Sequence, residues 1–252
     1  ANLRDNDSIT ATGQISVTQG SDEIIEIKLV DDFITTFNNE GYVTADGNNA
    51  ITLNDKNADG WYIATANGED VLRVKFNPDG SYTYEQFTAI EHPDANGANT
   101  KDISFAVTAV DADGDTNNAS VTISITDDTP TIDANPVEVN LVEGQSTTID
   151  LLDTNSNDFL GNDNNPGADG AKLSSFNYGG TEYTAFNTGS DSAGNYKEVA
   201  FKGEGEGDTD GTLRVYESGK VVITTDEFAQ SDKKDFRDSI SYTVIDNDGD
   251  TA

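Results

Sequence analysis

Short runs of alternating apolar and polar residues recur along the whole chain. Between residues 120 and 126 the aliphatic side chains fall on one face and the hydroxyls on the other, as in a half-buried strand. Residues 103–107 and 240–244 alternate in the same way. No long capped helical pattern competes with these runs, although short helical turns are expected around residues 31–37 and 226–229. We therefore expect an all-β chain built from Greek-key β-sandwiches.

One of these patterns occurs twice along the chain. Residues 110–116 read V-D-A-D-G-D-T and return as I-D-N-D-G-D-T at 245–251, each time after an alternating strand. The triplet L-R-V at 72–74 likewise returns at 213–215. A period this long indicates whole domains in series rather than a solenoid of small repeats.

The repeat divides the chain into two expected domains, residues 1–128 and 129–252. Paired aspartates followed by a proline at 127–130 predict a stiff, extended linker at the joint, which could itself bind metal. The first copy continues beyond its Asp-rich segment into a strand at 119–126, whereas the second stops at residue 252. We therefore expect the second domain to lack its last strand, unless another segment supplies it.

The net charge of the chain limits the classes of partner that it can bind. Its 252 residues include 47 acidic and only 14 basic side chains, for a formal net charge of −33. A surface this negative repels nucleic acid and anionic lipid, so we expect neither as a partner. It also repels itself, which destabilises the compact state unless cations neutralise it. A halophilic or merely soluble surface is the alternative, but the acids cluster in Asp/Asn/Gly loops, which favours metal binding.

The sequence has no cysteine and no long apolar segment. Without disulfides, bound metal is the obvious means of cross-linking an extracellular fold. No apolar stretch approaches the length of a membrane span, and the first residues do not resemble a signal peptide. We therefore expect no direct membrane insertion, in a chain that is soluble or a fragment of something larger.

The two repeated acidic segments, residues 111–116 and 246–251, are named here the first and second Asp box. In each, carboxylates at alternate positions project to one side of an extended segment, and a glycine allows a tight bend. Calcium fits such an oxygen cage because it accepts six to eight oxygens in loose geometry. A solvated Asp/Gly turn is the competing interpretation, but the repetition and the neighbouring residues 127 and 128 favour metal. The predicted ligands are Asp111, Asp113, Asp115, Asp127, Asp128, Asp246, Asp248 and Asp250.

Three further oxygen-rich loops are candidate metal sites. Residues 55–60 match the first half of an EF-hand loop, but Ala66 occupies the place of the bidentate glutamate. Glu69 could replace it through folding of the loop, and a solvated turn is equally compatible with this segment. Segments 162–170 and 204–211 are also rich in oxygen and glycine, with a disordered acidic loop as the alternative for each. The predicted ligands in these loops are Asp55, Asn57, Asp59, Asp208 and Asp210.

Residues suited to catalysis are few. His92 is the sole histidine, and the chain has no cysteine. A zinc site would therefore lack most of its usual nitrogen and sulfur ligands, so we favour a structural role for His92. Trp61 could stack on a sugar ring, but a sole tryptophan in an all-β domain is more often part of the core. Acidic residues are abundant, yet none lies in an apolar setting that would raise its pKa, and no nucleophile–base motif appears. We therefore expect the protein not to be an enzyme.

Eight short segments carry a resemblance to a known family: residues 14–22, 79–82, 92–94, 111–116, 127–130, 142–144, 201–205 and 246–251. In this order, and partly in two copies, they resemble the tandem bacterial immunoglobulin-like repeats of giant RTX adhesins exported by type I secretion. The resemblance covers nearly the whole chain. It implies Ig-like β-sandwich domains of a surface adhesin that stiffen on binding calcium, and some domains of such proteins bind sugars or peptides. The stretch 208–211 departs from the usual pattern as an insertion, which could form an extra calcium loop or part of a ligand site.

Together, pattern and resemblance predict a calcium-rigidified extender segment of a bacterial cell-surface RTX adhesin, which supports adhesion or biofilm formation. The alternative is a calcium-dependent ligand-binding module of the same adhesin, for a host or cell-surface peptide or glycan. An ion with open coordination beside an exposed aromatic residue, such as Trp61, Tyr178 or Tyr183, would favour this alternative. We expect a secreted monomer on the bacterial surface, whose other partners are neighbouring domains of the same long chain.

Overall fold

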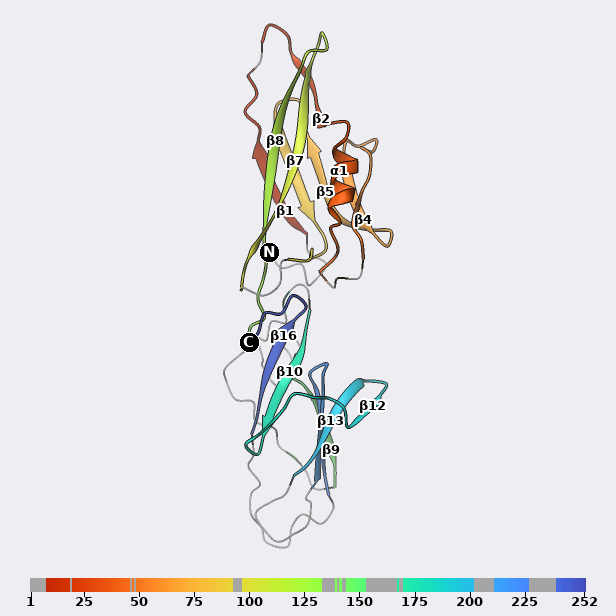
Figure 1. Cartoon of the computed structure of the whole chain (residues 1–252), viewed down its shortest axis with the longest axis vertical. Helices are drawn as coiled ribbons and strands as arrows, with labels where there is room; N and C mark the ends of the chain where they lie inside the picture. The colour runs from red at the N-terminus through yellow and green to blue at the C-terminus, as the bar shows by residue number, and fades with distance from the viewer. Residues whose placement is uncertain are drawn as a thin grey trace. The chain divides into compact units, whose positions relative to one another are not determined.

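A computed structural model describes residues 8–18, 20–45, 47, 49–92, 97–132, 139, 141, 144–152, 167, 170–201, 211–226 and 239–252. The chain divides into two units, Ala1–Asp128 and Thr129–Ala252, which are described separately. Nearly all regular structure in both units consists of antiparallel β-strands, drawn as arrows in Figure 1. The prediction of an all-β chain of sandwich domains is therefore confirmed.

The described residues of the first unit form two antiparallel sheets. The larger sheet consists of β1 (Ile9–Gln14), β3 (Thr52–Leu53), β4 (Tyr62–Ala66), β5 (Glu69–Phe76) and β6 (Ser81–Gln86). The smaller sheet consists of β2 (Ile24–Leu29), β7 (Thr100–Asp111) and β8 (Thr116–Thr126). Their strand orders are β1-β6-β5-β4-β3 and β2-β7-β8. The runs predicted at residues 103–107 and 120–126 are thus the two strands of one long hairpin.

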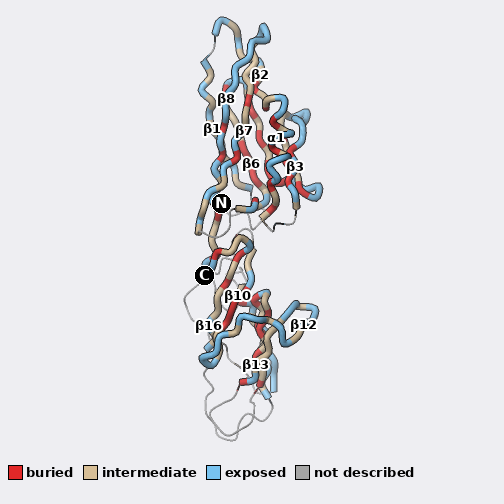
Figure 2. The backbone as a smooth tube through the Cα atoms, in the orientation of Figure 1, coloured by how far each residue is buried: buried red, intermediate tan, exposed pale blue. Residues whose placement is uncertain are grey.

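Apolar side chains from both sheets form the core of the first unit. Alternation along β7 places Ile103, Phe105 and Val107 on one face, where each is at most 1% exposed. The ring centroid of Phe105 lies 6.5 Å from that of Phe76 on β5, so the two sheets pack face to face. In Figure 2, buried positions along the strands of this unit alternate with more exposed ones.

The described part of the chain contains a single helix, α1 (Phe33–Glu40), which overlaps the helical turn predicted at residues 31–37. Phe33 and Phe37 lie one turn apart on it and are buried against the core. The helix ends at Gly41, whose left-handed backbone (φ +73°) suits glycine. No described helix is long and apolar enough to cross a membrane. Residues 227–229 of the second predicted turn lie outside the described residues.

The part of the second unit that the structure describes has a comparable arrangement of two antiparallel sheets. One sheet consists of β9 (Ser146–Asp150), β12 (Gly189–Asp191), β13 (Gly194–Phe201), β14 (Gly211–Tyr216) and β15 (Lys220–Thr225). The other consists of β10 (Ala171–Tyr178), β11 (Thr181–Tyr183) and β16 (Ile240–Asp246). Their strand orders are β12-β13-β14-β15-β9 and β11-β10-β16. Leu213 and Val215 of β14 share one buried cluster with Val244 of β16, so this core lies between the two sheets.

Corresponding strands take corresponding places in the two units. The L-R-V triplet lies on the central strand of the larger sheet both times, on β5 and on β14. Both β7 and β16 end at the first aspartate of an Asp box. The sequence repeat is therefore also a repeat of topology, with β16 in the place of β7.

Candidate metal centres

The first Asp box forms a closed loop between β7 and β8. Oδ1 of Asp111 accepts hydrogen bonds from the backbone N–H groups of Gly114 (3.1 Å) and Asp115 (2.8 Å). The backbone N–H of Asp111 donates in turn to the carbonyl oxygen of Asp115 (3.1 Å). Gly114 has a φ of +95°, a conformation that costs a residue with a Cβ atom free energy. The aspartate and the glycine are therefore both needed to form this bend.

The second Asp box folds in the same way. Oδ1 of Asp246 accepts hydrogen bonds from the N–H groups of Gly249 (3.0 Å) and Asp250 (2.6 Å). The N–H of Asp246 donates to the carbonyl oxygen of Asp250 (3.0 Å), and Gly249 has a φ of +104°. Each unit therefore carries the same loop at the end of the equivalent strand.

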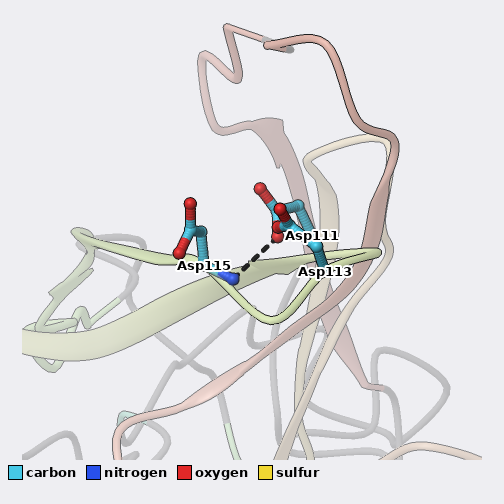
Figure 3. Close-up of side chains that lie close together, drawn as sticks. All are labelled: Asp111, Asp113 and Asp115. Carbon is cyan, nitrogen blue, oxygen red and sulfur yellow. Dashed lines mark hydrogen bonds between the residues drawn. The ribbon is translucent and has the colours of Figure 1, made fainter.

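The carboxylates of the first Asp box lie close enough together to share one cation. Asp111, Asp113 and Asp115 each offer an oxygen, and the three oxygens lie within 4.8 Å of one another. Oxygens on opposite sides of a calcium ion are about 5 Å apart, because calcium–oxygen distances are about 2.3–2.6 Å. Figure 3 shows the carboxylates of Asp111 and Asp113 side by side, with Asp115 across the loop and its N–H directed at Asp111.

The crowding changes the proton affinity of two of these groups. A hydrogen bond with Asp113 lowers the pKa of the Asp111 carboxyl. The same contact, together with the negative charge of Asp111, raises the pKa of Asp113. Two carboxylates that share a proton in this way can share a metal ion instead, and a divalent cation would remove the repulsion between them.

The second Asp box is more buried. Asp246 and Asp250 are only 4% and 8% exposed. Both carboxylate oxygens of Asp248 are buried and accept no hydrogen bond. An ionised carboxylate without a donor is costly to bury, and a bound cation would offset that cost. A carboxylate oxygen of Asp250 lies within 4.8 Å of one of Asp248, which makes a shared cation geometrically feasible.

Two acidic residues that were not predicted as ligands lie at the same end of the smaller sheet as the first Asp box. Ile24, the first residue of β2, pairs with Asp111, the last residue of β7. Asp22 and Glu23 directly precede Ile24, so the strand register brings them to the same end of the smaller sheet as the box. In the sequence, these two residues could have been noticed as an acidic pair immediately before an alternating run. Their position beside the first Asp box follows only from the pairing of β2 with β7, which are far apart in sequence.

Asp127 and Asp128 are predicted metal ligands, but they lie too far from the first Asp box to share an ion with it. They follow β8, whose 11 residues separate them from the box by about 35 Å at about 3.4 Å per residue. Asp127 is 8% exposed, and its N–H donates to the carbonyl oxygen of Asn99 (2.8 Å). Nδ1 of His92 lies 3.7 Å from its Oδ1, and Nε2 of His92 lies 3.1 Å from the carbonyl oxygen of Ile125. These contacts fit the structural role expected for the histidine.

The loop at residues 55–60 has the geometry of a turn. Oδ1 of Asn57 accepts hydrogen bonds from the N–H groups of Asp59 (3.0 Å) and Trp61 (2.9 Å), which use both of its lone pairs. Asp55 and Asp59 belong to no cluster of three or more acidic groups within the described ranges. Glu69 begins β5, and the five residues of β4 place it about 15 Å from the loop. It therefore cannot replace the missing EF-hand glutamate, and the geometry favours a solvated turn.

The expectation that Trp61 belongs to the core is wrong. The residue is partly exposed and lies outside the buried cluster of its unit. The guanidinium carbon of Arg73 lies 4.5 Å from the centroid of its ring, and Nζ of Lys75 lies 6.0 Å away. Arg73 also pairs with Glu85 on β6 (2.5 Å). Because Arg73 and Lys75 alternate with buried residues of β5, they mark the outer face of the sheet and Trp61 lies there with them.

The remaining candidate site residues either pack against the core of the second unit or lie outside the described residues. Tyr178 and Tyr183 pack against the core of the second unit, and the ring of Tyr183 stacks on Phe176 at a centroid distance of 4.9 Å. They are therefore not free aromatic platforms. Asp208 and Asp210 lie outside the described residues, as does most of the loop at 162–170.

Comparison with known proteins adds one similarity. Residues 1–124 match the model of a protein family described as a domain of unknown function (DUF5801). The matched segment lies within the first unit and ends inside β8. No curated protein matches the chain. The description of the matched family names no activity.

Proposed function

We propose that the chain is an extender segment of a bacterial cell-surface adhesin of the RTX type, and that calcium rigidifies it outside the cell. Two β-sandwich units in series, each with an Asp box at the same place in its topology, support this proposal. A repeated binding loop suits a repeated mechanical part better than a unique catalytic centre. In this proposal the protein is exported by type I secretion and supports adhesion or biofilm formation by holding other domains away from the cell.

The single observation that carries the calcium assignment is the environment of Asp248. Its two carboxylate oxygens are buried without a hydrogen-bond donor, between Asp246 and Asp250 in the sequence of the second Asp box. Oxygen-only donor sets select hard cations, and calcium accepts the irregular geometry of a short loop more readily than magnesium does. Asp248, Asp250 and Asp246 would hold the ion in this unit, and Asp111, Asp113 and Asp115 would hold it in the first.

Calcium would couple the rigidity of the segment to its location. Extracellular calcium modules bind with dissociation constants of about 0.1–1 mM. A site at about a hundredfold excess of calcium over its dissociation constant adds about 2.7 kcal/mol to the stability of the native state. Submicromolar calcium inside a cell would leave such sites empty, and millimolar calcium outside would fill them. The segment would therefore stiffen only after export.

The test is thermal unfolding and small-angle scattering of the chain in 10 mM calcium and in excess EGTA. We expect calcium to raise the melting temperatures of both units and to narrow the distribution of particle dimensions. Asp248→Asn removes the charge of the buried carboxylate, and we expect it to abolish the calcium-dependent shift of the second unit alone. Glu182→Gln is the matched control, because Glu182 is an exposed acid on β11 of the same unit. Equal melting curves with calcium and EGTA would refute the calcium proposal.

The position of Trp61 favours a second candidate function, a ligand-binding module for a peptide or glycan. A partly exposed indole beside the Arg73–Glu85 ion pair offers a stacking surface next to hydrogen-bonding groups. Trp61 is the sole tryptophan, so its fluorescence reports directly on this surface. Titration with neutral oligosaccharides and short peptides should change the emission if the surface binds them. Unchanged emission across the panel would leave the extender as the better proposal.

A further inference from the structure

A pocket of about 350 Å³ opens on one side of the first unit, away from Trp61 and from the Asp boxes. Three parts of the chain line it: the end of β2 with the turn that follows, the start of α1, and the loop between β3 and β4. A volume of this size suits a small molecule. The side chains around the pocket therefore indicate which kind of molecule it could hold.

The floor of the pocket is mostly apolar. Leu29 and Tyr62 line it and are only 4% and 6% exposed, and Val30 and Ile34 pack partly buried against the core beside them. The backbone N–H of Leu29 donates to the hydroxyl of Tyr62 (3.2 Å), which joins β2 of the smaller sheet to β4 of the larger one. The floor is thus built from the packed core and can receive an apolar group.

The rim of the pocket carries charges of both signs. Lys28 and Lys56 supply two ammonium groups, and Asp31 and Asp55 supply two carboxylates. Nζ of Lys28 lies 3.5 Å from Oδ1 of Asp31, and Lys56 pairs with Glu26. The side chains of Lys28 and Asp31 are 37% and 95% exposed, and ion pairs this exposed contribute little to stability. A ligand can therefore replace one partner of such a pair at little cost.

The charge of the whole chain and the charges of the rim select against simple ions. A net charge of −33 repels an anion at long range, and the two ammonium groups of the rim repel a cation at short range. A zwitterion with an apolar side chain avoids both penalties. Its carboxylate fits beside Lys28 and Lys56. Its ammonium group fits beside Asp31 and Asp55, and its side chain fits the apolar floor.

We propose that this pocket binds a free α-amino acid with an apolar side chain. Asp55, which the sequence suggested as a metal ligand, then serves to bind an ammonium group instead. The pocket lies in the first unit and includes no residue of an Asp box. The inference is therefore independent of calcium binding and goes beyond the extender proposal.

The experiment is a titration of the ¹⁵N-labelled chain in EGTA, followed by heteronuclear NMR. The three probes are L-leucine, N-acetyl-leucine, which lacks the ammonium group, and leucinamide, which lacks the carboxylate. We expect leucine to shift the amide signals of Leu29, Ile34 and Asp55 in a saturable way. Each of the other two probes should bind at least about threefold more weakly, because each loses one set of ion pairs. Equal binding of the three probes, or no saturable shift with leucine at millimolar concentration, would overturn the proposal.

Two variants test the residues of the rim. Lys28→Gln and Asp55→Asn should each weaken leucine binding about two- to fivefold and leave the amide spectrum outside the pocket unchanged. Lys75→Gln is the matched control, because Lys75 lies on β5 outside the pocket and its loss changes the net charge of the chain equally. Leucine binding to Lys75→Gln should equal that of the native chain. Equal weakening by Lys28→Gln and Lys75→Gln would show that overall charge, and not this pocket, governs binding.

Discussion

Substitution of Asp246 separates the two roles that the structure gives to the first aspartate of an Asp box. Oδ1 of Asp246 caps the loop by accepting the N–H groups of Gly249 and Asp250. In the calcium proposal, the same carboxylate also contributes charge to the ion. Asp246→Ala removes both roles, whereas Asp246→Asn keeps an oxygen acceptor in place and removes only the charge.

The magnitudes follow from the two hydrogen bonds and the ion. A hydrogen bond to a charged group contributes about 1.5–3 kcal/mol at most, so the loss of two partly compensated bonds in Asp246→Ala should cost about 2–4 kcal/mol in EGTA. Asp246→Asn should cost less than about 1.5 kcal/mol under the same conditions. In 10 mM calcium the native protein should gain about 1.4–2.7 kcal/mol if the site has a dissociation constant of about 0.1–1 mM. Neither variant should show this gain.

Urea unfolding of the second unit, followed by far-ultraviolet circular dichroism at both calcium concentrations, measures these differences. If Asp246→Asn retained the full calcium-dependent gain in free energy of unfolding, the carboxylate charge would not contribute to ion binding. If Asp246→Ala were as stable as Asp246→Asn in EGTA, the two backbone hydrogen bonds would not stabilise the loop. Either result would refute one half of the reasoning without affecting the other.

Three further predictions concern other positions. Gly80→Ala should lower the free energy of unfolding of the first unit by at least about 1 kcal/mol. The reason is that Gly80 has a φ of +88° and an added Cβ atom would lie 2.4 Å from the carbonyl oxygen of Ile15. A differential scanning calorimetry trace identical to that of the native protein would contradict this prediction. The hydrogen bond from Tyr216 lowers the pKa of Asp191, so Asp191 stabilises the folded state above its unfolded pKa and this contribution disappears as pH falls through its lower folded pKa. Tyr216→Phe should therefore raise the pKa of Asp191 in a carboxyl NMR titration. The raised pKa of Asp113 should fall when calcium is added, since the ion replaces the shared proton, and an unchanged titration in calcium would exclude Asp113 as a ligand.

The sequence predicted the features that depend on local patterns. Alternation identified the strands that contain Phe105 and Val121, because a strand with one buried face repeats every two residues. The box motif predicted a tight loop at Gly114 and Gly249, because glycine adopts a positive φ at little cost. These features are set within a few residues of each other, so no knowledge of the tertiary fold is needed to find them.

The features that the sequence did not reveal depend on the tertiary fold, above all on the direction and pairing of strands. Asp127 is only 12 positions from Asp115 in the sequence, but the extended conformation of β8 places the two at opposite ends of a sheet. Trp61 has the side chain of a core residue, and only the neighbouring cations on β5 show that it lies on the outer face. The two boxes share one motif, yet Asp113 is exposed whereas the oxygens of Asp248 are buried, so the motif alone does not determine burial.

The two Asp boxes share a hydrogen-bond pattern but differ in exposure, and this difference bears on how calcium would act. In the first box Asp113 and Asp115 are exposed, so water can solvate their charges when no ion is bound. In the second box the oxygens of Asp248 have no donor and little access to water. An empty second box therefore carries an electrostatic cost that an empty first box largely avoids. Calcium should stabilise the second unit more than the first, and high salt should substitute for calcium only in the first.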